Sequence, residues 1–145
     1  MRRVTVIKGE KLETIEELRK FEDLNNIKLP QQFISFYTNQ NPIIIEESDF
    51  IVENREPYDI VFFPFSNESS EWTIQKSFNN LNEDFFESKY LSFGSDSGGW
   101  QYVISIQESD FGKVYFCRMD EDLEDALTLL ANSFEEFING LEKPQ

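Results

Sequence analysis

The sequence predicts a fold of the α+β class, in which helices and strands occupy separate stretches of the chain. Three observations lead to this prediction. Apolar side chains recur at helical spacing near both ends of the 145-residue chain, and short strand-like runs lie between them. Within residues 90–106 a polar glycine turn separates two of these runs, and residues 111–116 add another soon afterwards. Successive strands joined by short turns are typical of an antiparallel meander.

A first helix is predicted over residues 11–25. Thr14 followed by Glu17 has the spacing of a capping box. Apolar side chains recur every three residues behind this box: Ile15, Leu18 and Phe21. Two successive asparagines at 25–26 help to end the helix.

A second helix begins near Pro30, because the missing N–H group of proline costs nothing in the first turn of a helix. Its aromatic side chains share one face: Phe33, Phe36 and Tyr37. We expect the two helices to pack against each other and against a sheet.

Short β-branched or aromatic runs predict strands in the middle of the chain, at residues 43–45, 50–52 and 59–65. Between residues 70 and 90 the spacing of the apolar side chains becomes helical, with Ser69 or Ser70 as the expected cap. The side chains that show this spacing are Trp72, Phe78, Leu81, Phe85 and Phe86.

The strands within residues 90–116 have apolar side chains on both faces, which predicts a central position covered on both sides. Ser133 and Glu136 form a second capping box and predict a carboxy-terminal helix. The buried stripe of this helix is expected to contain Phe134, Phe137, Ile138 and Leu141. A helix that starts earlier, at Asp122, is the competing prediction.

Composition limits the chemistry of the protein. We expect one domain over residues 1–145, whose core is supplied by 22 aromatic side chains. The amino terminus reaches charged residues too soon for a signal peptide, and no apolar run is long enough to cross a membrane, so a cytoplasmic protein is expected. A single cysteine, Cys117, and the absence of histidine exclude an internal disulfide and a cysteine zinc cluster. No metal or other cofactor is expected.

The net charge of −15 is unevenly distributed. Residues 1–28 carry seven basic and six acidic side chains, whereas residues 29–145 carry six basic and 22 acidic ones. Many of the acidic side chains fall into two clusters, within residues 46–59 and 120–125. Such a surface repels nucleic acid and anionic lipid and accelerates encounter with a basic protein. The alternative is that the charge serves solubility alone.

Several motifs, taken in order, resemble those of the SUKH superfamily. These are Leu29-Pro30 with the aromatic residues behind it, the stretches 90–106 and 111–116, and the run Ala-Asn-Ser-Phe-Glu-Glu-Phe-Ile at 131–138. One departure follows the second helix, where Asn39-Gln40-Asn41 stands in place of an Asn-Gly-Gly turn. Asparagine tolerates the left-handed conformation, so we expect the turn to survive.

The resemblance covers residues 15–141 and implies a largely antiparallel sheet flanked by amino-terminal helices and a carboxy-terminal helix. It also implies a non-enzymatic binding module, because members include yeast regulators of cell-wall synthesis and bacterial immunity proteins that neutralise partner toxins. Our leading hypothesis is an immunity protein that occludes the catalytic domain of a cognate toxin, a nuclease with a basic substrate site. The alternative is a regulatory scaffold that binds a cellular protein or peptide.

Seven residues form the predicted contact set for the partner, chosen for charge, aromatic anchoring and placement in loops. They are Asp49, Glu53, Trp72, Asp96, Trp100, Glu121 and Asp122. Each tryptophan has a second interpretation as a core residue. Oligomeric state is left open.

Other chemistries have weaker support. The Ser-Asp-Ser-Gly-Gly stretch at 95–99 lacks the lysine and spacing of a nucleotide-binding loop and predicts a reverse turn. The acidic run at 120–122 lacks the glycine and spaced ligands of a calcium loop. A glycan-active enzyme would need two carboxylates paired in a cleft, which a sequence does not show. Cys117 has Arg118 as its basic neighbour on the opposite strand face, which predicts a buried structural thiol.

Overall fold

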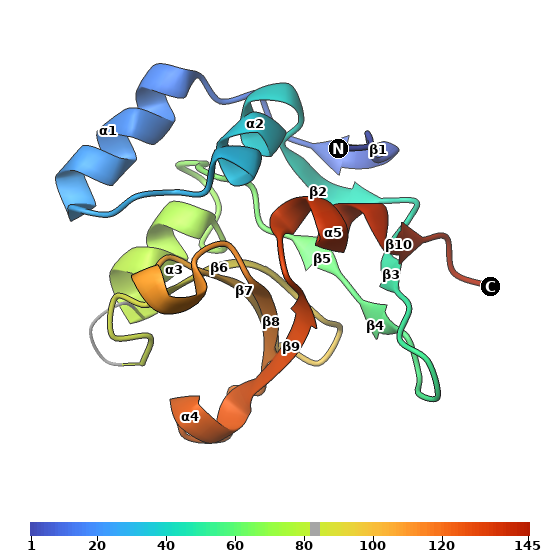
Figure 1. Cartoon of the computed structure of the whole chain (residues 1–145). Coiled ribbons are helices and arrows are strands. Elements are labelled where there is room, and N and C mark those ends of the chain that lie inside the picture. Colours follow the sequence, from blue (N-terminus) through green and yellow to red (C-terminus); the bar gives the residue numbers. More distant parts are fainter. Residues whose placement is uncertain (82–84) are drawn as a thin grey trace.

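The computed structural model describes residues 1–81 and 85–145. Its centre is a five-stranded antiparallel sheet with the strand order β5-β6-β7-β8-β9 (Figure 1). The strands are β5 (Val61–Phe62), β6 (Tyr90–Ser95), β7 (Gln101–Ser105), β8 (Val114–Cys117) and β9 (Leu127–Ala131). Strands β6, β7 and β8 form the predicted meander.

Two smaller antiparallel sheets accompany the central one, with strand orders β1-β2 and β10-β3-β4. Their strands are β1 (Val6–Gly9), β2 (Pro42–Ile45), β3 (Asp49–Phe50), β4 (Tyr58–Asp59) and β10 (Leu141–Glu142). Strands β2, β3, β4 and β5 overlap the runs or turns predicted between residues 42 and 65, whereas β1, β9 and β10 were not expected. Leu141 therefore belongs to a strand and not to the carboxy-terminal helix.

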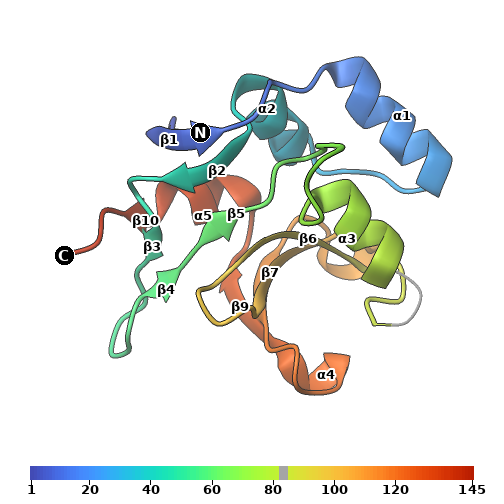
Figure 2. The ribbon, with the colours of Figure 1, turned by 180° about the vertical axis from the view of Figure 1, so that it is seen from behind.

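Helices lie outside the central sheet (Figures 1 and 2). They are α1 (Ile15–Asn25), α2 (Gln31–Asn39), α3 (Ile74–Leu81), α4 (Leu123–Ala126), α5 (Phe134–Asn139) and the 3-10 turn Glu108–Asp110. In both views α1 and α2 lie at one end of the molecule and α4 at the other. The α+β class is confirmed.

The amino-terminal helices form where local chemistry predicts them. The Thr14 hydroxyl accepts a hydrogen bond from the Glu17 backbone N–H and caps α1, and Asn26 ends the helix in the left-handed conformation. Helix α2 packs on α5 and on the sheet through aromatic rings. The Phe33 ring centroid lies 5.4 Å from that of Phe134 and 6.4 Å from that of Phe93.

Helix α3 is shorter than the helix predicted within residues 70–90, and neither Ser69 nor Ser70 caps it. The Thr73 hydroxyl accepts from the Lys76 backbone N–H at 3.1 Å, and α3 runs from Ile74 to Leu81. Residues 82–84 of the predicted helix lie outside the described residues. Glu87 and Ser88 adopt positive φ angles, so a turn leads into β6.

Every residue of the central strand β7 is buried, and the two faces of the strand contact different groups of side chains. Tyr102 and Ile104 belong to the main core, together with the aromatic side chains of α2 and α5. Val103 belongs to a second cluster that includes Cys117 and Ala126. This arrangement confirms the prediction that the meander is covered on both sides.

Both predictions for the carboxy-terminal region are partly right. Asp122 does precede a helix, but that helix is only the short α4, and the chain then forms the unpredicted strand β9. The Ser133 hydroxyl accepts from the Glu136 backbone N–H at 3.1 Å and starts α5.

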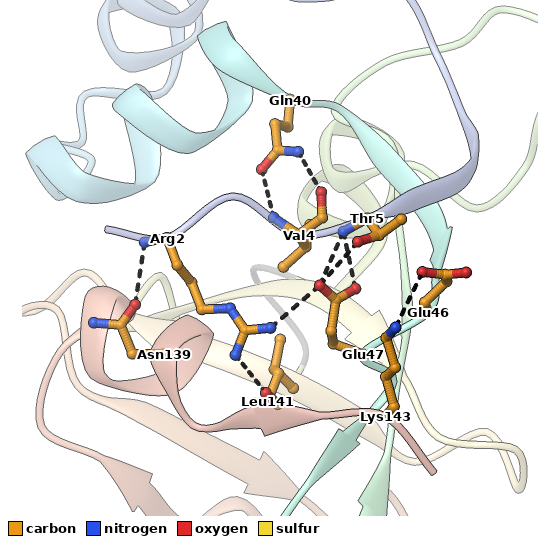
Figure 3. Close-up of polar contacts among 9 residues, drawn as sticks. All are labelled: Arg2, Val4, Thr5, Gln40, Glu46, Glu47, Asn139, Leu141 and Lys143. Atoms are coloured by element: carbon orange, nitrogen blue, oxygen red, sulfur yellow. Dashed lines mark hydrogen bonds and ion pairs between the residues drawn. The ribbon is translucent and has the colours of Figure 1, made fainter.

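The segment after α2 differs from the expected left-handed turn. Gln40 is extended, with a φ of −148°. Its side-chain amide bonds the Val4 backbone twice, and the Asn41 side chain donates to the Lys11 carbonyl and accepts from the Phe65 N–H (Figure 3 shows the Gln40 contacts). These two buried side chains join the amino-terminal segment to the middle of the chain.

The same amino-terminal segment is held from the carboxy-terminal side (Figure 3). The Arg2 guanidinium donates to the Leu141 carbonyl at 2.6 Å and forms an ion pair with Glu47 at 3.2 Å. The Arg2 N–H donates to the Asn139 side chain. We call the contacts of residues 2–5 with Gln40, Glu47, Asn139 and Leu141 the N-terminal clasp.

Candidate functional site

Three connections lie at the end of the molecule that carries α4 (Figures 1 and 2). They are the β3–β4 hairpin, the β6–β7 turn and the segment between β8 and α4. Six of the seven predicted contact residues lie in or next to these connections: Asp49, Glu53, Asp96, Trp100, Glu121 and Asp122. The fold thus gathers most of the predicted set.

The β6–β7 turn is built by carboxylates. Asp96 Oδ1 accepts from the backbone N–H groups of Gly98 at 3.0 Å and Trp100 at 2.8 Å. Asp59 Oδ2, from β4, accepts from the Ser97 N–H at 2.9 Å. Gly99 has a φ of +94°, a backbone conformation that residues with a side chain rarely adopt. The predicted reverse turn is therefore present, and it fixes the position of the Trp100 ring.

Trp100 borders a hollow of about 350 Å³. The aromatic side chains that line it are Tyr58, Trp100, Tyr102 and Phe116. The Phe116 ring centroid lies 6.0 Å from Trp100 and 5.2 Å from Tyr102, in edge-to-face geometry. We call this feature the aromatic hollow.

Tyr102 and Asp59 both line the aromatic hollow. The Tyr102 hydroxyl donates a hydrogen bond to the Asp59 backbone carbonyl at 2.5 Å. Burial, followed by the negative charge of Asp59, raises the pKa of Tyr102 far above its usual value. Tyr102 therefore stays protonated and keeps its role as a hydrogen-bond donor.

Charged side chains surround the aromatic hollow. Asp59 and Asp96 line it together with Arg55 and Arg118. The Arg55 guanidinium lies 3.6 Å from the centre of the Tyr58 ring, a cation–π contact. Asp59 and Asp96 accept hydrogen bonds from backbone N–H groups of the β6–β7 turn. They therefore fix the shape of the hollow and also give it negative charge.

One acidic cluster reaches this hollow directly and the other through a basic residue, since Asp59 lines the hollow whereas none of residues 120–125 does. From one side, Asp49 pairs with Asp59 across β3 and β4, and burial together with the Asp59 charge raises the pKa of Asp49. From the other side, Arg118 forms an ion pair with Glu121 at 3.0 Å and donates to the Asp125 carbonyl. The second cluster is thus linked to the hollow through Arg118, which lines it.

Glu53 and Asp122 belong to the two acidic clusters but do not line the hollow. Both are exposed, and neither side chain makes a hydrogen bond or ion pair with any residue that the structure describes. Their carboxylates are therefore free to meet a partner.

Two other acidic residues of the first cluster have different roles. Glu47 is buried in the N-terminal clasp, where it accepts from the Thr5 N–H at 2.8 Å. Glu46 forms an ion pair with Lys143 at 3.8 Å.

Trp72 lies apart from the aromatic hollow. It is 62% exposed and stacks on Phe63, with ring centroids 6.0 Å apart. It lines a second groove, of about 440 Å³, whose walls also include Val61 and the β6–β7 turn. Trp72 is therefore an exposed aromatic residue, whereas Trp100 is partly buried against the core.

The SMI1/KNR4 family (SUKH-1) matches residues 13–140. The chain belongs to this family. The match confirms the resemblance to the SUKH superfamily, and it spans the aromatic hollow and both acidic clusters. The sequence matches no curated protein.

In this SUKH domain, sequence reasoning missed several residues of the aromatic hollow. They are Arg55, Tyr58, Asp59, Tyr102, Phe116 and Arg118. Strand alternation could have placed Tyr102 and Phe116 on one face, because they are direct partners across β7 and β8. Nothing local reveals that β4 lies close enough for Asp59 to accept from Tyr102.

The single cysteine of the SUKH domain is in an environment that makes its thiol unreactive. Cys117 is fully buried, and burial raises the pKa of its thiol to about 12. Among residues 1–81 and 85–145, no cluster of carboxylates or thiols has the arrangement of a metal site. No helix in the same part of the chain is long and apolar enough to span a membrane.

Proposed function

We propose that this SUKH domain is a non-enzymatic protein-binding module, and specifically an immunity protein that occludes the catalytic domain of a basic toxin. The SUKH superfamily includes immunity proteins, and the chain belongs to it. The observation that carries the proposal is the aromatic hollow at Trp100, which Asp59 of one acidic cluster lines and which the Arg118–Glu121 ion pair links to the other cluster.

A nuclease is the toxin class that these acidic clusters fit. A nuclease must present basic side chains to bind phosphates, and the exposed carboxylates of Glu53 and Asp122 offer negative charge in their place. Opposite charges also speed the encounter and set the orientation of the partner. The inhibitor then blocks substrate by covering its site, without turnover.

Trp100 supplies the apolar part of the contact. Aromatic side chains at the centre of an interface contribute a large share of binding free energy. Trp100 is fixed by the turn at Asp96 and by its packing on Phe116, so little conformational entropy is lost when a partner covers it.

A regulatory scaffold is the second candidate function. The groove at Trp72 favours it, because an exposed tryptophan stacked on Phe63 and bordered by Val61 suits an apolar peptide. In that case a peptide would bind there, and the acidic clusters would serve solubility.

Charge reversal distinguishes the two functions. The tagged protein is expressed in its native host, and copurifying proteins are identified at about 50 mM and about 200 mM salt. The double variant Glu53→Lys with Asp122→Lys is compared with Glu16→Lys with Asp23→Lys, which changes the net charge equally but on α1 at the opposite end of the molecule.

We expect a basic nuclease domain that binds at low salt, weakens at higher salt and has at least about tenfold lower affinity for the Glu53 and Asp122 double variant. The α1 control should bind as the unchanged protein does. Equal binding by both double variants, or loss of the partner on Trp72→Ala alone, would instead support the scaffold.

A further inference from the structure

Strand β9 is an edge of the five-stranded sheet and pairs only with β8 among the described strands. The Arg118 N–H donates to the Ala126 carbonyl at 2.9 Å, so Arg118 and Ala126 form a hydrogen-bonded pair. This pair determines which residues of β9 direct their backbone groups toward β8. In an antiparallel pair, alternate residues turn their N–H and C=O groups away from the partner strand. Leu127 and Leu129 are these residues in β9, and no hydrogen bond reaches their backbone groups from elsewhere in the described chain.

This edge lacks the usual protection. Natural edge strands carry lysine, proline or inward charge that discourages pairing with another chain. The sequence of β9 is Leu-Thr-Leu-Leu-Ala, without charge or proline, and Leu129 is 48% exposed. Two other edges do carry such residues, since β1 contains Lys8 and β10 contains Glu142 shortly before Pro144.

The edge adjoins the aromatic hollow. Thr128 lines the aromatic hollow, so a strand added beside β9 would also border the hollow. Acidic side chains flank both ends of the edge. They are Glu124 and Asp125 before β9 and Glu136 after it, whereas the neighbouring Glu135 is already paired with the amino group of Met1 at 2.8 Å.

These flanking charges select the occupant. A second copy paired antiparallel to β9 would place its own acidic flanks beside the same residues, and each chain carries a net charge of −15. An extended segment with lysine or arginine at its ends has the complementary charge. We infer that the free edge of β9 binds an extended, basic-flanked strand of a partner protein, which pairs with the backbone of Leu127 and Leu129.

This inference rests on the proposed function as a protein-binding module and adds how the partner is held. Backbone pairing supplies affinity in such strand addition, and the side chains of the added strand supply specificity. The added strand would cover Leu129 while the aromatic hollow beside it takes a side chain of the same partner.

The test uses the full chain and a synthetic peptide, Lys-Lys-Val-Thr-Val-Thr-Val-Lys-Lys. Amide hydrogen exchange of Leu127 and Leu129 is measured by NMR with and without this peptide. The control is the same peptide N-methylated at all of its valine and threonine residues, which keeps its charge and side chains but removes its strand donors. We expect exchange at both leucines to slow at least about tenfold with the first peptide and to stay within about twofold with the second.

A protein variant provides a second control. Leu129→Pro removes an N–H that points away from β8, and edge strands accept proline at such positions. The melting temperature of this variant should stay within a few degrees of that of the unchanged protein. The variant should no longer bind the peptide. Equal effects of the two peptides, or retained binding by Leu129→Pro, would show that the peptide is held by charge alone and would overturn the inference.

The outcomes separate this inference from the proposed function. Slowed exchange at Leu127 and Leu129 that depends on protein concentration, without any peptide, would identify a second copy as the occupant and overturn the inference. A toxin that copurifies but leaves both amides unprotected would overturn the strand-addition inference and leave the proposed function standing. Specific protection by the peptide, with no toxin recovered, would uphold strand addition and count against immunity.

Discussion

Gln40 binds both backbone polar groups of Val4. Its Nε2 donates to the Val4 carbonyl at 2.8 Å, and its Oε1 accepts from the Val4 N–H at 3.1 Å (Figure 3). A side-chain amide thus takes the place of a neighbouring strand. This pair is buried, so each hydrogen bond satisfies a group that water does not reach.

Gln40→Ala is expected to destabilise the protein by about 2 kcal/mol, because it leaves the N–H and C=O of Val4 buried without partners. The measurement is the free energy of unfolding in urea. Gln31→Ala, at an exposed position on α2, is the matched control and should change stability by less than about 0.5 kcal/mol. Equal effects of the two substitutions would show that the Gln40–Val4 hydrogen bonds add nothing to stability.

Glu47 should make part of the stability depend on pH. Burial by itself would raise the pKa of Glu47, but the hydrogen bonds from Thr5 and the Arg2 guanidinium outweigh burial and hold the pKa below its ordinary 4.5. Glu47→Gln is therefore expected to cost about 1–2 kcal/mol at neutral pH. Since the folded-state pKa is lowered, this difference from the unchanged protein should persist above 4.5 and disappear as the pH falls through the folded-state value.

The control for Glu47 is Glu46→Gln, since Glu46 is exposed and its ion pair with Lys143 is long. We expect this substitution to cost less than about 0.5 kcal/mol at any pH. Urea unfolding between acid and neutral pH measures both variants, and a Glu47→Gln difference that grows as the pH falls would contradict the assignment.

Cys117 should be unreactive in the native protein. Burial raises the pKa of its thiol to about 12, so very little thiolate forms near neutral pH. An aromatic disulfide reagent at pH 8 should modify it only as fast as the protein unfolds, and urea should accelerate the reaction. Rapid modification without urea would show that the second cluster opens locally.

The two tryptophans should respond differently to a soluble quencher. Trp100→Phe leaves the exposed Trp72, whose emission should lie at longer wavelength and be quenched readily by iodide. Trp72→Phe leaves Trp100, which packs on Phe116 and should be better protected. Steady-state fluorescence with increasing iodide measures both. Equal quenching would mean that the ring of Trp100 leaves the hollow in solution.

The helices could be predicted from sequence because their ends depend on neighbouring residues. Thr14 and Ser133 start their helices as predicted, and Asn26 ends α1. Each of these residues acts on neighbours only a few positions away. Strand β9 was missed because Leu-Thr-Leu-Leu-Ala fits a short helix as well as a strand. Its pairing with β8 decides between them, and that contact is tertiary.

The candidate site could be predicted only in part. Charge and turn residues selected loops, and six of the seven predicted contact residues lie in or next to three connections at one end of the molecule, where their role stays a prediction. The aromatic hollow depends on the hydrogen bond from Tyr102 to Asp59, which are 43 positions apart. For the same reason the segment at Gln40 was expected to turn in the left-handed conformation, since its partner Val4 lies 36 positions away.

The N-terminal clasp has a consequence for synthesis on the ribosome. Arg2 is made 139 residues before Leu141, which accepts its hydrogen bond. At typical rates of translation these two residues are made on the order of ten seconds apart. During that interval residues 2–5 can bond only to Gln40 and Glu47 among their partners in the clasp, so the clasp can close fully only after Leu141 has left the ribosomal tunnel.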